Sequence, residues 1–284
     1  VKDGMQSWAD VLAGNFCSLG GELQLNSRVD RIVTENGKAV GVTCNGETEK
    51  GDYVISAGDY KKTFLKLLDD RSLLPKDFLQ KVEAAQVSEG VVTVYLSLSI
   101  SNDRLREYLK IPHVSYMKLD SEANVEEPHD REYFKKSGVT LYSPSLHNGE
   151  LVPEGKSSLM LQNIAPTGWM DNWGGGDREK YGALKRQAIE DMIEQATAVI
   201  PDLRDFIEFK DGATPLTYER YTHNTGGASS AWSWNPKKKF HKSMMKSYVD
   251  TPVKNLYIGS CWASQIGGVP GALGAAYACA RRIK

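Results

Sequence analysis

The sequence has no long apolar run and almost no net charge. None of its 284 residues lie in a stretch of eighteen or more apolar residues, so the sequence predicts no membrane-spanning helix. Its 35 Lys and Arg residues are balanced by 36 Asp and Glu, which leaves a net charge of -1 and no bulk attraction for nucleic acid. We therefore expect no nucleic-acid partner. The hydrophobic fraction of 40% and charged fraction of 25% are ordinary for a soluble globular protein.

Cysteine and histidine are sparse and scattered. The five histidines show no HExxH or similar ligand spacing, so we predict no metal site and a structural or surface role for each histidine. The cysteines lie far apart with no paired spacing, which favours buried, reduced thiols and a cytoplasmic location. These cysteines are Cys17, Cys44, Cys261 and Cys279.

The sequence also lacks the common signatures of nucleotide binding and covalent catalysis. It contains no GxSxG elbow, Walker loop, CxxC or GxGxxG. Gly268, Gly271 and Gly274 are spaced by three, which usually means close helix packing. No pair of carboxylates stands out as an acid–base couple, so we assign no catalytic residue. This pattern fits an enzyme whose cofactor performs the chemistry while the protein positions it.

The most informative stretch is the last thirty residues. Leu256–Ile258 is a short apolar run that predicts a buried strand, and Gly259 ends it. After the pair Gly267-Gly268, small residues predict a helix from Pro270 to Ala280. Unpaired N–H groups and the helix dipole favour an electron-rich group at such a helix start. A tight strand–loop–helix joint that binds nothing is an equally good interpretation.

Periodicity and turn residues predict the remaining elements. Asn36-Gly37 and Asn45-Gly46 indicate hairpin turns, so residues 28–50 should form a three-stranded meander. Asp177 has the position of an N-cap for a long amphipathic helix that Pro201 closes. The expected helices are 5–19, 61–68 and 75–85, and the expected strands are 22–26, 53–58, 92–100, 139–143, 157–164 and 206–210. Strands separated by long stretches favour a mixed α+β fold, with a mostly antiparallel sheet flanked by helices.

Four irregular segments remain. Residues 101–136 read as a helix followed by an exposed excursion, and 169–176 as a loop with two tryptophans and three glycines. The aromatic and glycine residues of 213–234 can wall a flat-ring pocket or only anchor a long loop, and we favour the anchor. The lysines of 237–246 surround Phe240 and two methionines. A solvated basic face is the default interpretation, and a peripheral contact with a membrane surface is the alternative.

Four segments together resemble one known group of flavoproteins. They are residues 4–22, residues 25–59, residues 214–228 with the run TPLTYERYT, and residues 255–272 with NLYIG and GGVPGA. In order and spacing they are similar to the C-terminal two-thirds of the phytoene desaturase, carotenoid isomerase and retinol saturase group. That group belongs to the amine-oxidase-like FAD-dependent flavoproteins.

The resemblance implies a split FAD-binding domain. Residues 1–58 and 251–284 would belong to that domain, and residues 59–250 would form the substrate domain. The positions implied to contact FAD are Val29, Ala57, Gly58, Gly259, Ser260, Gly268, Val269, Pro270, Gly271 and Ala272. The positions implied on the substrate side are Tyr95, Tyr221, Gly226 and Gly227.

The resemblance also implies a function for the parent protein. Its members pass a hydride between a carbon of a hydrophobic, polyene or isoprenoid substrate and flavin N5. Their GxGxxG turn precedes the matched region and is absent here, so we expect a truncated chain that binds FAD weakly or not at all and is inactive alone. The alternatives are an amine-oxidase-like flavoenzyme and a non-catalytic module that binds a lipid or a partner. The oligomeric state is not indicated.

Overall fold

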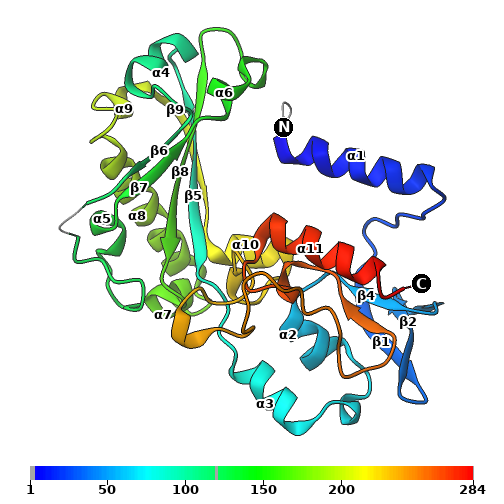
Figure 1. Cartoon of the computed structure of the whole chain (residues 1–284). Helices are drawn as coiled ribbons and strands as arrows, with labels where there is room; N and C mark the ends of the chain where they lie inside the picture. Colours follow the sequence, from blue (N-terminus) through cyan, green and yellow to red (C-terminus); the bar gives the residue numbers. More distant parts are fainter. Residues whose placement is uncertain (1–3, 119–120, 284) are drawn as a thin grey trace. The chain divides into compact units, whose positions relative to one another are not determined.

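A computed structural model describes residues 4–118 and 121–283 and shows the predicted mixed α/β fold (Figure 1). Contacts divide the chain into two compact units. Unit 1 contains the described residues up to Leu23 together with Gly90–Thr217, and unit 2 contains Gln24–Glu89 and Tyr218–Lys284. The assignment of 1–58 and 251–284 to a cofactor domain and of 59–250 to a substrate domain stays a prediction, because compactness does not say which segments bind a ligand.

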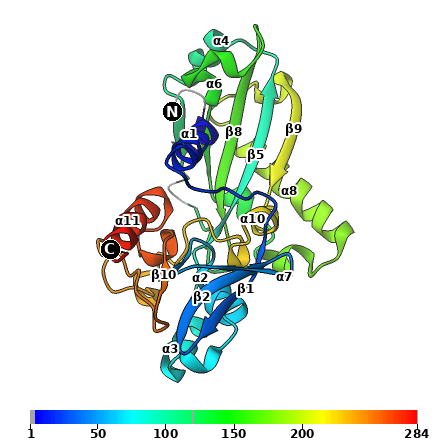
Figure 2. The ribbon, with the colours of Figure 1, turned by 90° about the vertical axis from the view of Figure 1, so that its right-hand side faces the viewer.

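Unit 1 is built on a five-stranded antiparallel sheet (Figure 2). Its strand β5 (Gly90–Leu98) alternates as predicted, with Val92, Val94, Leu96 and Leu98 buried on one face and Tyr95 exposed on the other. In sheet order the strands are β6 (His113–Tyr116), β7 (Val139–Tyr142), β8 (Ser157–Ala165), β5 (Gly90–Leu98) and β9 (Ile207–Ala213).

One face of this sheet is covered by α8 (Arg178–Ala196), the helix predicted after Asp177. The Asp177 carboxylate accepts hydrogen bonds from the N–H groups of Glu179 and Lys180, which confirms the N-cap. The apolar stripe of α8 packs into a core with the even-numbered side chains of β5. The other helices of the unit are α1 (Gly4–Ser18), α4 (Asn102–Tyr108), α5 (Tyr133–Lys136), α6 (Pro144–His147), the 3-10 turn η3 (Gly149–Leu151), α7 (Trp169–Gly174), α9 (Leu203–Phe206) and α10 (Pro215–Thr222), which continues into unit 2.

The segment predicted as a loop at 169–176 is instead the short helix α7, and its turn is left-handed. Residues 170–173 have φ between 48° and 61°. Trp169 and Trp173 are both fully buried, with ring centroids 4.7 Å apart. Left-handed backbone is unfavourable for residues other than glycine. The burial of two tryptophans stabilises this segment against that cost.

Unit 2 begins with the predicted meander of β1 (Val29–Glu35), β2 (Lys38–Cys44) and β3 (Glu47–Lys50). Both turns have positive φ at Asn and Gly, with Asn36 at 49° and Gly37 at 76°. That backbone matches the right-handed twist of the flanking strands, so the two Asn-Gly pairs determine where the chain reverses.

A second, two-stranded sheet joins β4 (Val54–Ser56) to β10 (Leu256–Ile258) in parallel. The terminal helix α11 (Gly268–Ala280) follows β10, close to its predicted bounds. The remaining turns and helices of the unit are α2 (Tyr60–Lys62), the π-helical η1 (Thr63–Leu67), η2 (Arg71–Leu73), α3 (Lys76–Ala84), η4 (Thr225–Gly227), η5 (Pro236–Lys238) and η6 (Cys261–Ala263).

Three further expectations differ from the structure. Residues 22–26 form no strand, because all five are exposed and pair with no neighbouring strand. The excursion in 101–136 contains the strand β6, which the high charge of the region concealed. Within this excursion, residues 119–120 lie outside the described part of the chain. Cys17 is exposed, Cys44 and Cys261 are half-buried, and only Cys279 is buried, although all four thiols are free.

Candidate functional site

The parallel strands β4 and β10 end at the same edge of their sheet, and this edge is the candidate site. Ligands of α/β proteins commonly bind beyond the carboxyl ends of parallel strands. Here Ala57 and Gly58 follow β4, and Gly259 and Ser260 follow β10. The Gly259 N–H donates to the Ser56 carbonyl at 2.9 Å. The Ser260 hydroxyl donates to the carbonyl of Gly58 at 3.3 Å, although the two residues are 202 positions apart.

Two glycines at this edge are required by close packing. A Cβ on Gly259 would lie 2.4 Å from Cγ2 of Ile55, and a Cβ on Gly267 would lie 2.0 Å from the Ser230 carbonyl oxygen. Gly267 also has φ 65° and ψ -164°, a conformation open essentially to glycine alone. The glycines therefore bring β10 and the start of α11 against the rest of the unit.

The first turn of α11 is open at the surface. Gly268, Val269 and Pro270 are exposed, Ala272 is half-buried and Gly271 is buried against Ser264. The N–H groups of a first helical turn have no partner within the helix, and the helix dipole adds partial positive charge there. This surface can accept the electron-rich edge of a ligand.

A buried carboxylate links this edge to the glycine turn η4. Asp59 is 5% exposed and caps α2 by accepting from the Lys62 N–H at 2.7 Å. Its second oxygen accepts from the N–H of Thr225, also at 2.7 Å. Asp59 was not among the predicted site residues. The signal that could have found it is an aspartate in N-cap position directly after a buried strand.

The carbonyl of Trp262 is the centre of a buried hydrogen-bond network. Trp232 Nε1 lies 2.8 Å and His241 Nε2 lies 2.9 Å from this oxygen. Burial lowers the pKa of His241 to about 4, despite the opposing effect of its hydrogen bond to Trp262. His241 is therefore neutral near pH 7 and donates through Nε2. Trp232 is fully buried, as expected of a residue that anchors a long loop, whereas Trp234 is 53% exposed.

The predicted substrate residues fall into both units. Gly226 and Gly227 form η4, which Asp59 holds through Thr225, and Tyr221 is 75% exposed on α10. Tyr95 is 39% exposed and belongs to unit 1, in the middle of β5. Of the predicted cofactor residues, those after β4 and β10 and at the start of α11 belong to one region of unit 2. Val29 lies apart from them in sequence, at the start of β1, and is half-buried.

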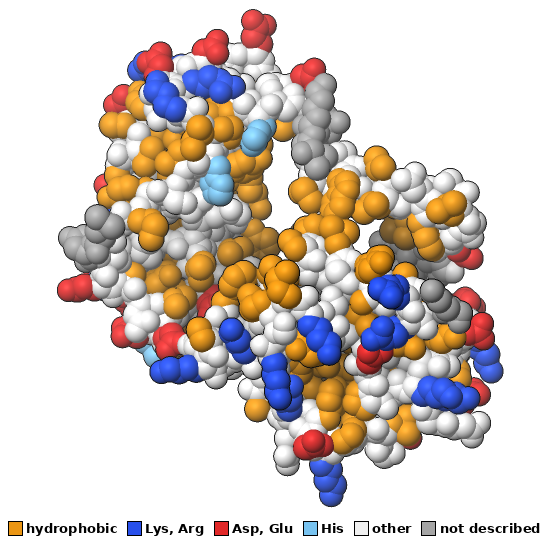
Figure 3. Space-filling view, viewed as in Figure 1, with side chains coloured by type: hydrophobic (Ala, Val, Ile, Leu, Met, Phe, Trp, Pro, Cys, Tyr) orange, Lys and Arg blue, Asp and Glu red, His pale blue; other side chains and the backbone are white. Residues whose placement is uncertain are grey.

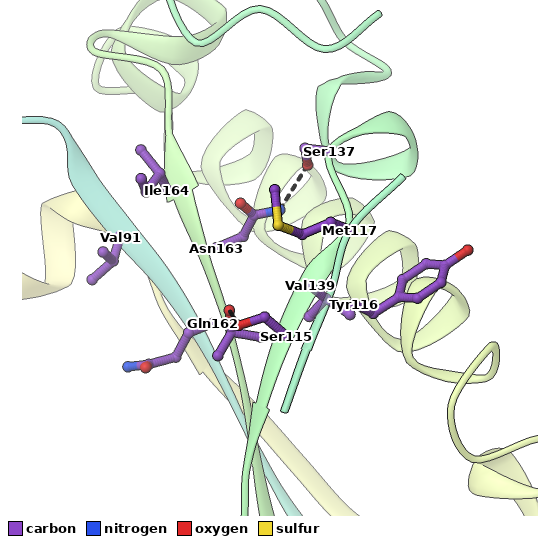
Figure 4. Close-up of a pocket in the computed structure, with 10 residues that line it drawn as sticks. Val91, Ser115, Tyr116, Met117, Ser137, Val139, Gln162, Asn163 and Ile164 are labelled. Carbon is purple, nitrogen blue, oxygen red and sulfur yellow. Dashed lines mark hydrogen bonds between the residues drawn. The ribbon is translucent and has the colours of Figure 1, made fainter. Parts of the chain in front are cut away.

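Unit 1 has a surface hollow of about 350 Å³ on its sheet (Figure 4). Val91, Gln162 and Ile164 line it and share the sheet face of Tyr95, since Val91 pairs with Ile164 and Tyr95 with Met160. Asn163, also in the lining, donates to Ser137 Oγ at 2.6 Å. The lining contains no acid, base or cysteine, so this hollow can hold an apolar group but offers no chemistry of its own.

The described residues contain neither a metal-ligand cluster nor a membrane-crossing helix. Between 4 and 118 and between 121 and 283, no group of three or more His, Cys, Asp or Glu side chains is placed to hold a metal ion. Within the same residues no helix is both long and apolar enough to cross a membrane.

Comparison with known proteins relates the whole chain to one family. The family model described as "Flavin containing amine oxidoreductase" matches residues 1–284. Among curated proteins, the chain is 27% identical over 226 residues to a prolycopene isomerase of Daucus carota, covering 79% of this chain and 34% of that protein. It is 26% identical over 253 residues to a 4,4'-diapophytoene desaturase of Methylomonas sp, covering 85% of this chain and 47% of that protein. The chain thus spans half or less of the length of these two relatives.

Solved structures confirm the fold. An oxidoreductase from Methanosarcina mazei superposes with a TM-score of 0.62 at 17% identity, covering 98% of this chain and 55% of that chain. A putrescine oxidase variant superposes with a TM-score of 0.60 at 13% identity, covering 99% of this chain and 53% of that chain. The match of the family model over all 284 residues and the agreement in fold lead to one conclusion: the chain belongs to the flavin-containing amine oxidoreductase family.

Proposed function

We propose that this chain is the C-terminal portion of a FAD-dependent oxidoreductase that acts on a hydrophobic, polyene or isoprenoid substrate. The observation that carries the proposal is the parallel pairing of β4 with β10, which sets Gly58 and Gly259 at one edge of a sheet in the same unit as an open helix start. The relatives named as a prolycopene isomerase and a 4,4'-diapophytoene desaturase support this substrate class.

The residues at this edge fit one part of FAD. Ala57, Gly58 and Gly268 are exposed and carry little or no side chain, so the flat ring and its ribityl chain can approach the backbone. When bound, FAD supplies the hydride acceptor or donor. The start of α11 then favours negative charge on the ring edge that faces it, through its N–H groups and dipole. Binding of the FAD pyrophosphate would need a second set of contacts from a glycine-rich turn of the GxGxxG kind. These 284 residues do not contain such a turn.

The substrate side is proposed to be apolar and without catalytic side chains. Tyr95, Val91 and Ile164 share one face of the unit 1 sheet, which suits a hydrocarbon chain better than a charged amine. The protein's part would be to orient the substrate and exclude water, with no acid or base from this chain.

Flavin titration tests the cofactor half of the proposal. We expect the 284-residue chain to quench FAD fluorescence only weakly, and the same chain preceded by a nucleotide-binding segment to retain FAD through gel filtration. Because G268V would place a branched side chain at the helix start where φ is 56°, it should abolish flavin retention by the extended protein while circular dichroism shows an intact fold. Stoichiometric FAD on the 284-residue chain alone would contradict the expected weak binding.

Anaerobic reduction of the bound flavin tests the substrate half. We expect loss of flavin absorbance with polyene substrates delivered in detergent micelles, and no loss with aliphatic amines. Reduction by amines alone would replace the proposal with an amine oxidase. An extended protein that retains no flavin and changes no substrate would favour the non-catalytic binding module instead.

A further inference from the structure

Unit 2 carries a lysine-rich surface that the proposed chemistry does not use. Between Asn235 and Val249 the sequence contains five lysines and no acidic residue. All five side chains belong to exposed residues. We call these residues, together with Lys81, the lysine surface; its members are Lys81, Lys237, Lys238, Lys239, Lys242 and Lys246.

The fold adds Lys81 to this segment from a distant part of the sequence. Lys81 lies on α3, and its Nζ is 4.3 Å from the centre of the Phe240 ring. A hollow of about 290 Å³ lies between these elements and is lined by Lys81, Lys237–Lys239, Gln86 and Phe240. Among the described residues, no acidic side chain forms an ion pair with Lys237, Lys239 or Lys242. Several positive charges are therefore held together without neutralisation.

Large apolar side chains project from this segment and from the position just before Asn235. Met245, between Lys242 and Lys246, is 90% exposed, and Trp234 is 53% exposed. The chain that carries these side chains is anchored in the core, because the Phe240 ring stacks on Trp232 with centroids 3.9 Å apart. In Figure 3, Lys and Arg side chains are interspersed with hydrophobic ones on the surface around α2 and α3. The segment thus combines a fixed support with exposed apolar side chains and three lysines, Lys237, Lys239 and Lys242, that form no ion pair with the described residues.

We propose that the lysine surface docks on an anionic lipid bilayer, with Met245 and Trp234 entering the interface between headgroups and acyl chains. Lysine ammonium groups are attracted to anionic headgroups, and apolar side chains beside them gain by leaving water. A nucleic acid or an acidic peptide would satisfy the lysines but would leave Met245 in water. The proposal rests on this surface alone and holds whether or not the chain binds FAD.

Vesicle co-sedimentation of the 284-residue chain tests this. We expect binding to vesicles of phosphatidylcholine with phosphatidylserine, weakening as salt is raised, and little binding to phosphatidylcholine alone. The triple variant K237Q/K239Q/K242Q should bind roughly a hundred-fold more weakly, at about five-fold for each lysine. The control K38Q/K110Q/K180Q removes the same charge from exposed sites elsewhere and should stay close to the unmodified chain.

A second variant separates the bilayer from other polyanions. M245S should weaken vesicle binding but leave unchanged any binding to a single-stranded oligonucleotide, and its thermal unfolding should match that of the unmodified chain because Met245 is exposed. Equal losses for the two triple variants would reduce the effect to net charge and overturn the proposal. So would vesicle binding that ignores M245S, or no binding to anionic vesicles at all.

Discussion

The carboxylate of Asp59 accepts a hydrogen bond from the backbone N–H of Thr225, 166 residues further along the chain, at 2.7 Å. Its other oxygen caps α2. One buried side chain therefore holds the end of β4, the start of α2 and the glycine turn η4 in fixed relation. The geometry of the proposed site depends on Asp59, although this side chain is too buried to contact a bound molecule itself.

Replacing Asp59 with alanine should destabilise the protein by about 2–3 kcal/mol, because it removes a helix cap and leaves the Thr225 N–H without an acceptor. D59N keeps one oxygen and should lose about half as much. D70A is the matched control, since Asp70 caps η2 but is exposed. Urea unfolding measures all three, and equal losses for D59A and D70A would contradict the linking role of Asp59.

Alanine substitutions at two neighbouring glycines should differ sharply. G267A would place a Cβ 2.0 Å from the Ser230 carbonyl and force a side chain into backbone that only glycine tolerates, so we expect a loss of more than about 3 kcal/mol. G268A meets nothing closer than 3.8 Å and should cost only about 1 kcal/mol for its positive φ. Thermal unfolding of both variants checks this; similar melting temperatures would show that the contact with Ser230 is not rigid.

The free energy of unfolding should decrease as the pH falls below neutral, because of His241. Its pKa is about 4 in the folded chain against 6.5 as the ordinary value, so between these two values the unfolded chain binds a proton that the folded chain excludes. The free energy of unfolding should therefore be constant above pH 6.5 with respect to this group. It should decrease by about 3 kcal/mol as the pH falls to 4.

The variant H241Q isolates this contribution. It removes the titrating ring and keeps a donor that can reach the Trp262 carbonyl, so its stability should depend less steeply on pH between 4 and 6.5. Denaturant unfolding of both proteins across that range gives the difference. If the two curves run parallel, protonation of His241 does not limit acid stability.

The left-handed turn of α7 predicts a stabilising glycine. Asn172 is exposed with φ 56°, so N172G should relieve backbone strain and raise stability by up to about 1 kcal/mol. E179G, in the first right-handed turn of α8, should lower stability by roughly 0.5–1 kcal/mol. The opposite signs of the two glycine substitutions, measured by thermal unfolding, are the diagnostic result; a loss at Asn172 would contradict the left-handed geometry.

Local chemistry made much of this fold predictable. Asn36-Gly37 specifies a hairpin turn, the alternation around Val94 specifies a strand with one buried face, and Asp177 specifies a helix start. Each depends on residues within a few positions of one another. The turn at Met170 was missed, because nothing in a methionine or a tryptophan indicates positive φ; only burial of the tryptophan rings makes that backbone favourable.

The long-range contacts of the structure could not be predicted from the sequence. The bond from Thr225 to Asp59 and the approach of Lys81 to Phe240 join segments more than a hundred residues apart, and no local pattern encodes them. The resemblance to flavoproteins grouped the segments around β4 and β10, and the structure pairs those strands. The roles predicted for individual site residues stay predictions, since no ligand contact tests them.

The pairing of β4 with β10 also has a consequence for how the protein is made. On the ribosome, β4 emerges about 200 residues before its sheet partner, so this edge stays unpaired while unit 1 is translated. Pairing between such distant segments closes a large loop, which makes it a slow step in folding. We therefore expect the sheet edge after β4 and β10 to be the last region to mature during synthesis and the region most dependent on protection from aggregation until the C-terminal residues appear.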